Sequence, residues 1–131
     1  MIVLDASAAV ELLLALPLSK RVQQQVERAE WQLAAPQLLV LEVIQVFRRR
    51  VLGGLTPPDV AEDGRQLLGE LGIRYFDHPP LVERVWELRN NVTAYDASYL
   101  ALSEALDAEL VTTDARLASA AGHAARICLV Q

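Results

Sequence analysis

Residues 1–17 read MIVLDASAAVELLLALP, an apolar triplet, an aspartate, and a run rich in alanine and leucine that Pro17 closes. Three consecutive apolar residues that end in an acid indicate a short buried strand at 2–4. The apolar spacing at 7–16 is typical of a helix, which proline ends. A strand followed at once by a helix is the first half of the crossover unit that joins parallel strands.

The same alternation continues to the end of the chain. Further short strands are predicted at 31–34, 73–76, 110–113 and 126–130, with helices at 19–29, 36–52, 56–72, 79–89, 93–106 and 115–122. Strands that alternate with helices imply a parallel sheet with helices on both faces. The predicted fold class is α/β, a three-layer α/β/α sandwich around a mainly parallel five-stranded sheet.

Length and composition predict one domain that meets a partner. A chain of 131 residues can bury one core but not two, and no repeat or linker divides it, so a single domain over 1–131 is expected. The chain is 53% hydrophobic and 22% charged, and its mean hydropathy is +0.23. This composition is more apolar than a monomer of this size needs, so some of the surface is expected to meet another protein.

The sequence favours a cytoplasmic protein without a membrane partner. No apolar run reaches the roughly 18 residues of a membrane span, and the apolar N-terminus carries Asp5 and Glu11 with no basic leader before them. Cys128 is the only cysteine, which excludes a disulfide framework and a cysteine metal site. We expect Cys128 to lie in a buried strand.

A net charge of −5 counts against a nucleic-acid partner, because lysine and arginine neutralise the phosphate backbone. Acidic residues gathered around a cation would lower the net charge while arginines elsewhere contact phosphate. Lys20 is the only lysine among the 12 basic residues, although coding bias would give the same preference for arginine. The densest basic cluster is Arg48-Arg49-Arg50, whose other explanation is a favourable interaction with the end of a helix dipole.

Two aspartates follow predicted strands. Asp5 ends the first strand and Asp114 follows the fourth. In open parallel sheets, ligands collect beyond the carboxyl ends of the strands, so both side chains are candidates for a site there. Each also has a structural explanation, since an aspartate between a strand and a helix is a favoured N-cap.

Glu42 interrupts an apolar stripe of its predicted helix. Its neighbours one turn away are Leu38, Leu39 and Val46. A carboxylate there is costly unless it is paired or binds a cation. Arg49 or Arg50 could reach back to it, but two helical turns span about 11 Å, so the pattern favours a cation.

Asp96 has a similar double interpretation. It lies three residues after Thr93, so the two could form a capping box at the start of the helix. Tyr99 and Leu100 lie one turn further on, which places the carboxylate on an apolar face as well.

Asp5, Glu42, Asp96 and Asp114 would repel one another if they met, and a divalent cation would resolve the conflict. Hard oxygen ligands without His or Cys nearby in the sequence favour Mg²⁺ or Mn²⁺ over zinc. Such an ion retains water and can lower its pKa for attack on phosphorus, so the predicted chemistry is phosphodiester hydrolysis.

These residues resemble the PIN domains, and among them the VapC-type toxins, over essentially the whole chain. The resemblance rests on Val3-Leu4-Asp5-Ala6-Ser7, on Glu42 in the helix after Pro36, on Thr93-Ala94-Tyr95-Asp96-Ala97-Ser98-Tyr99-Leu100-Ala101-Leu102, and on Leu110-Val111-Thr112-Thr113-Asp114. It implies that Asp5, Glu42, Asp96 and Asp114 form a catalytic metal site, with Ser7 and Thr112 as supporting polar residues. Alternation along the strand also puts Thr112 on the side of Asp114, although it could equally be an ordinary strand residue.

The resemblance further implies endonucleolytic cleavage of RNA, a homodimer, and inhibition by a cognate antitoxin. Arg48, Arg49 and Arg50 then become candidates for contact with RNA or antitoxin. Some PIN nucleases carry a further acid where this chain has Arg116, so one tightly held cation is expected rather than two. Arg116 could contact a phosphate or an acidic antitoxin residue, or could be a solvated helix side chain.

Other function classes fit less well. A dehalogenase-type phosphatase needs a second acid at the position of Ser7, and a receiver domain needs a lysine near its last strands. No glycine-rich nucleotide loop is present, and neither His78 nor His123 has a partner at catalytic spacing. The alternative from another class is a catalytically weak or inactive PIN-fold module that binds or regulates a partner.

Overall fold

A single parallel sheet forms the centre of the computed structural model, which describes residues 1–131. Its strands are β1 (Ile2–Leu4), β2 (Leu33–Pro36), β3 (Arg74–Phe76), β4 (Glu109–Thr112) and β5 (Ile127–Leu129). They lie in the order β3-β2-β1-β4-β5, and every neighbouring pair is parallel. The predicted five-stranded sheet is confirmed, and it is wholly rather than mainly parallel.

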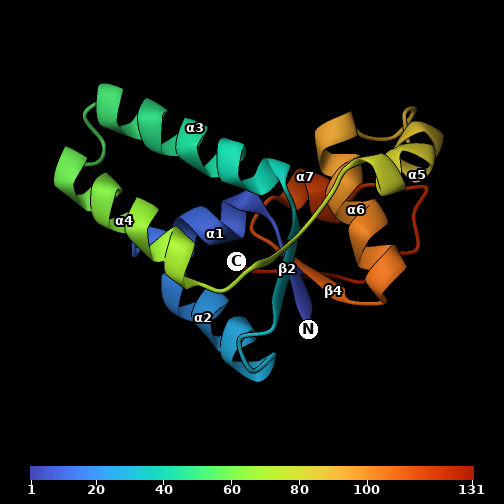
Figure 1. Cartoon of the computed structure of the whole chain (residues 1–131), viewed down its shortest axis with the longest axis horizontal. Coiled ribbons are helices and arrows are strands. Elements are labelled where there is room, and N and C mark those ends of the chain that lie inside the picture. Colours follow the sequence, from blue (N-terminus) through green and yellow to red (C-terminus); the bar gives the residue numbers. More distant parts are fainter.

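Helices cover both faces of the sheet. They are α1 (Ala6–Leu13), α2 (Ser19–Arg28), α3 (Leu38–Leu52), α4 (Pro58–Glu70), α5 (Val82–Glu87), α6 (Ala94–Leu106) and α7 (Ala115–Ala118), with a 3-10 turn η1 (Pro79–Leu81). Helix α1 packs among α2, α3 and α4 on one side, whereas α6 packs on β1, β2 and β4 with α5 beside it (Figure 1). The three-layer α/β/α sandwich is therefore confirmed. None of the helices is long and apolar enough to cross a lipid bilayer.

The central strands are buried on both faces, which explains their sequence. Val3 and Leu4 in β1 and Leu110 and Val111 in β4 have no exposed surface. Parallel strands covered on both sides read as continuous apolar runs rather than as an alternation of apolar and polar residues. The outer strands β3 and β5 keep partly exposed residues.

The register between β1 and β4 brings two distant segments together. Leu4 lies opposite Val111, and the backbone nitrogen of Asp5 donates a hydrogen bond to the Val111 carbonyl at 3.2 Å. Asp5 therefore leaves the sheet beside the segment Thr112 to Asp114, at the carboxyl edge of the two strands.

The boundaries differ from the prediction where turns and prolines intervene. Strand β2 begins at Leu33, because Glu30 and Trp31 adopt φ values of +53° and +59° in the turn after α2. Pro36 belongs to β2, so α3 starts at Leu38. The predicted helix at 79–89 is divided into η1, which begins with the two prolines, and the shorter α5. The last short helix ends at Ala118.

Candidate metal centre

Asp5 is a buried carboxylate held by three hydrogen bonds. Its Oδ1 atom accepts from the backbone nitrogen of Ala8 at 2.9 Å and from Ser7 Oγ at 2.7 Å. Its Oδ2 atom accepts from Thr112 Oγ1 at 2.5 Å. Burial raises the pKa of Asp5 above its ordinary value, and these three hydrogen bonds offset part of the rise. The N-cap interpretation is confirmed, but the cap uses only Oδ1.

Thr112 and Ser7 connect the ends of β1 and β4. Thr112 is fully buried, and its Oγ1 also accepts from the backbone nitrogen of Asp114 at 3.0 Å. Ser7 Oγ accepts from the backbone nitrogen of Thr113 at 3.0 Å. Thr112 is thus more than an ordinary strand residue, since it hydrogen-bonds to both aspartates of this edge.

Glu42 projects from α3 toward α6. The hydroxyl of Tyr99, which is only 2% exposed, donates to Glu42 Oε1 at 2.7 Å. Burial raises the pKa of Glu42, the tyrosine lowers it, and the charges of Asp96 and Asp5 raise it further. Glu42 forms no ion pair with any arginine, so the alternative in which Arg49 or Arg50 neutralises it is wrong.

Asp96 is half-buried in the first turn of α6. Its backbone nitrogen donates to Thr93 Oγ1 at 3.2 Å, the one half of a capping box that the structure contains. The Asp96 carboxylate itself has no hydrogen-bond partner within the chain. Its pKa is raised by burial first and by the charge of Asp114 second, with Arg116 opposing the rise.

Asp114 caps α7, as its position after a strand predicts. Its Oδ1 atom accepts from the backbone nitrogen of Arg116 at 2.9 Å. The guanidinium of Arg116 lies 3.5 Å from Asp114 Oδ2, and its side chain is 87% exposed. Such an exposed, long pair contributes little stability, so Arg116 remains available for other contacts.

The four carboxylates lie within electrostatic reach of one another. Asp5 interacts with Asp114 and with Glu42, and Asp96 interacts with Asp114 and with Glu42. Residues that are far apart in the sequence therefore meet at one edge of the sheet, with Arg116 as the one cation paired among them. No three His, Cys, Asp or Glu side chains are arranged closely enough to hold a metal ion together.

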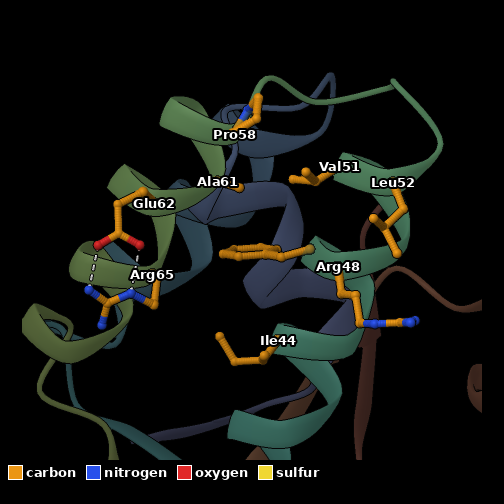
Figure 2. Close-up of a pocket in the computed structure, with 9 residues that line it drawn as sticks. Ile44, Arg48, Val51, Leu52, Pro58, Ala61, Glu62 and Arg65 are labelled. Atoms are coloured by element: carbon orange, nitrogen blue, oxygen red, sulfur yellow. Dashed lines mark hydrogen bonds and ion pairs between the residues drawn. The ribbon is translucent and has the colours of Figure 1, made fainter.

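The side chains of the three consecutive arginines of α3 have different surroundings. Arg50 donates to Thr56 Oγ1 at 2.9 Å and ties α3 to the turn that follows it. Arg48 lines a pocket between α3 and α4, and its charged end points away from that pocket (Figure 2). Arg49 lines a separate groove together with Glu42 and Tyr95. Of the cluster, only Arg49 shares a groove with one of the four carboxylates.

A PIN domain profile matches residues 2–123. The chain belongs to the PIN domain family. The match includes every segment that ends at the carboxyl edge of β1 and β4.

The curated relatives of this PIN domain are VapC ribonucleases. Ribonuclease VapC12 of Mycobacterium tuberculosis is 38% identical over 130 residues, which cover 99% of both chains. Ribonuclease VapC9 of the same organism is 42% identical over 124 residues, 89% of this chain and 88% of the relative. Ribonuclease VapC1 is 44% identical over 98 residues, 74% of each chain. The VapC-type resemblance is confirmed.

A solved structure supports the fold alone. The protein PAE2754 from Pyrobaculum aerophilum superposes with a TM-score of 0.69 at 24% identity, over 88% of this PIN domain and 76% of that chain. At this identity the similarity shows a shared arrangement of strands and helices and nothing beyond it.

Two features of the site escaped the sequence analysis. Tyr99 is the donor to Glu42, although the sequence analysis placed it only on an apolar face. A polar cavity beside Asp96, lined in part by Arg89, Asn90 and Asn91, comes from the loop between α5 and α6.

Proposed function

We propose that this PIN domain is a metal-dependent endoribonuclease, the toxin of a toxin–antitoxin pair, that hydrolyses RNA phosphodiester bonds. The observation that carries the proposal is the meeting of four carboxylates at one sheet edge without enough positive charge to neutralise them. RNA as the substrate is supported by the ribonuclease names of the VapC relatives.

The donor chemistry of Asp5, Glu42, Asp96 and Asp114 fits Mg²⁺ or Mn²⁺. All four offer hard oxygen atoms, and the pKa values of Asp5, Glu42 and Asp96 are raised by burial first and by the charges of neighbouring acids to a lesser extent. When bound, such a cation supplies a water of lowered pKa and positive charge beside the phosphate oxygens. Because the carboxylates are not at ligand spacing, the ion would have to draw the side chains together.

The remaining chemistry belongs to the side chains. Ser7 and Thr112 fix the orientation of both Asp5 oxygens, and the Tyr99 hydroxyl fixes Glu42 Oε1. The carboxylate of Asp96 has no partner, so it is free to bind the ion and to accept a proton from the attacking water. Supporting hydrogen bonds of this kind keep a site ready for its transition state.

RNA cleavage tests this proposal. A labelled single-stranded RNA is incubated with the purified chain and Mg²⁺, Mn²⁺ or EDTA, and the products are separated by length. We expect internal cuts only with metal, and a loss of roughly a hundredfold or more in Asp5→Asn and Asp96→Asn. Asp63→Asn, on the exposed side of α4, serves as the control and should cut like the wild type. Cleavage by Asp96→Asn at the wild-type rate would remove the site assignment.

A second function, a PIN-fold module that binds or regulates without cutting RNA, is favoured by one observation. No three acidic side chains lie at metal spacing, as they would in a preformed centre. The same cleavage assay separates the two functions, because such a module leaves RNA intact with every metal and still binds its partner.

The proposed partners are a cognate antitoxin and a second copy of the chain. Several large apolar side chains on and near the α3–α4 hairpin are exposed: Leu41 by 74%, Leu52 by 71%, Leu55 by 71% and Leu67 by 45%. Exposed apolar surface of this kind typically marks protein interfaces. Light scattering of the isolated chain would show the homodimer, and the toxin would act in the cytoplasm, where its RNA and antitoxin occur.

A further inference from the structure

A polar cavity opens directly beside Asp96, between the α5–α6 loop and the segment that begins at α7. Its volume is about 780 Å³, within the range of sites that hold small molecules. The side chains that give it polar character are Arg89, Asn90, Asn91, Thr93, Arg116 and Ser119, together with Asp96 itself. The cavity therefore includes one of the four carboxylates of the proposed metal centre, and its lining comes from the α5–α6 loop, the start of α6, and α7 with the residues after it.

The polar groups of this cavity are largely unused by the fold. Arg89 forms no ion pair, and Arg116 has only the 3.5 Å contact with Asp114. The side-chain amides of Asn90 and Asn91 are exposed and form no hydrogen bond within the chain. Two cations and two amides thus line the cavity beside Asp96.

Two of these groups, Arg89 and Asn91, are held in place by their neighbours. The guanidinium of Arg89 stacks on the Trp86 ring at 4.7 Å from its centroid, and Arg89 Nη1 donates to the Trp86 carbonyl at 3.0 Å. Asn91 packs against Gly122, where a Cβ atom would lie 2.9 Å from Asn91 Cγ. Gly122 has a φ of +87°, so a residue without a side chain lets the two segments approach.

We infer that this cavity binds the nucleotide next to the scissile phosphate of single-stranded RNA and selects its base, an assignment that rests on the proposed ribonuclease function. Arg89 and Arg116 contact the phosphates on either side of the base. The amides of Asn90 and Asn91 pair with the base edge, because an amide offers a donor and an acceptor side by side. The flanking phosphate is then positioned at Asp96 and the other carboxylates.

A single-stranded segment fits this cavity better than a duplex. Sequence-specific RNA recognition targets unpaired bases, which can turn outward, stack on aromatic rings or guanidinium planes, and expose their Watson–Crick edges. The Arg89–Trp86 stack offers such a plane, and the two asparagines lie directly after it in the chain. A base within a helix would keep its edge paired and out of reach of both amides.

The test compares cleavage and binding in matched variants. Cleavage with Mn²⁺ is measured on single-stranded oligoribonucleotides that differ only at the nucleotides flanking the wild-type cut. Binding of the same labelled oligoribonucleotides is measured by fluorescence anisotropy in EDTA, where a metal-dependent enzyme cannot cut. The variants are Asn90→Ala, Asn91→Ala, Arg89→Ala and Arg116→Ala. Gln24→Ala and Arg28→Ala, exposed residues of α2 beyond the opposite face of the sheet, are the controls.

We expect the two kinds of variant to differ. Loss of an asparagine should reduce the preference for the best base at one flanking position by about tenfold, as expected for one lost base contact. Loss of either arginine should weaken binding of all sequences alike. It should also lower the slope of the logarithm of the binding constant against the logarithm of the salt concentration by about one. The controls should behave as the wild type.

The outcomes separate this inference from the proposed function. If the wild type cuts RNA and both asparagine variants keep its base preference, the cavity assignment is overturned and the nuclease stands. If the wild type binds RNA without cutting it and the asparagine variants lose the base preference in binding, base selection by the cavity stands and the nuclease fails. Absence of both binding and cleavage overturns both.

Discussion

Asp5 shows how one side chain serves the fold and a site together. One oxygen atom caps α1 and accepts from Ser7, while the other accepts only from Thr112. Such a carboxylate is costly to bury unless its charge is compensated. Thr112, itself fully buried, contributes part of that compensation from the neighbouring strand.

Replacement of Thr112 by valine tests this hydrogen bond. The change preserves shape but leaves Asp5 Oδ2 and the backbone nitrogen of Asp114 without their partner. We expect a loss of about 1–3 kcal/mol in the free energy of unfolding, measured by urea denaturation, and a further rise in the pKa of Asp5. Thr113→Val, at a half-buried position, is the control, and equal stability of the two variants would contradict the account.

Glu42 should make the metal-free protein less stable at neutral pH. Its pKa is raised above the ordinary value of 4.5 on folding, so the unfolded chain loses this proton first as the pH rises. The free energy of unfolding is therefore reduced as the pH rises from the unfolded pKa through the folded one, and the loss is complete above both. Below both values the group has no effect.

Glu42→Gln should remove this loss and keep an acceptor for Tyr99. In EDTA at neutral pH, we expect the variant to be more stable than the wild type by at most about 1 kcal/mol, because the side chain is partly solvated. The gain should vanish in acid, and Glu70→Gln on the surface of α4 should show neither effect. Urea denaturation across this pH range makes the comparison, and lower stability of Glu42→Gln at neutral pH would contradict the raised pKa of Glu42, which is caused by burial first and by the charges of Asp96 and Asp5 after it.

Some residues of the candidate site could be identified from the local sequence pattern alone. Asp5 and Asp114 stand at strand ends, and Glu42 interrupts an apolar stripe, so all three could be found from neighbours in the chain. The donor to Glu42 could not, because Tyr99 reaches it across 57 positions of sequence. Such a contact depends on how α3 and α6 pack, which no local pattern contains.

At the scale of elements, the position of α4 depends on a close approach at Gly64. A Cβ atom there would lie 3.0 Å from Leu14 Cδ2 and 3.1 Å from the Phe47 ring. Gly64 thus lets α4 pack onto α1 and α3. Gly69, in the same helix, would meet nothing within 4 Å.

The two glycines of α4 should therefore respond oppositely to alanine. Gly69→Ala should stabilise the protein by about 0.5–1 kcal/mol, because alanine is the better helix former. Gly64→Ala should destabilise it by about 1 kcal/mol, because overpacking outweighs the same helical gain. Thermal unfolding of both variants measures these stability changes. A Gly64→Ala variant more stable than the wild type would contradict the prediction, because it would show that α4 can move to accommodate the methyl group without loss of stability.

The elements themselves were largely predictable, and their ends were not. Continuous apolar runs and alanine-rich spacing identified five strands and the helices between them. The start of β2 and the division into η1 and α5 escaped, since they depend on a positive φ at Trp31 and on the geometry of Pro79-Pro80. Strand order also lies outside local pattern, because it depends on pairing between segments that are far apart in the sequence.

At the scale of the whole molecule, the negative net charge and an RNA substrate are compatible if a cation intervenes. The chain carries −5, and part of that charge is gathered at the carboxyl edge of β1 and β4. A cavity with arginines lies on the Asp96 side of this edge and a groove with Arg49 lies on the Glu42 side. Phosphate binding would thus use arginines beside the acids rather than a uniformly basic surface.

Calorimetric titration with Mn²⁺ shows whether Asp5, Glu42, Asp96 and Asp114 together bind a hard divalent cation, as we propose. We expect one tight site per chain in the wild type and in Asp63→Asn, and binding at least roughly tenfold weaker in Asp96→Asn and Glu42→Gln. Binding of Mn²⁺ to Asp96→Asn and Glu42→Gln as tightly as to the wild type would contradict this proposal.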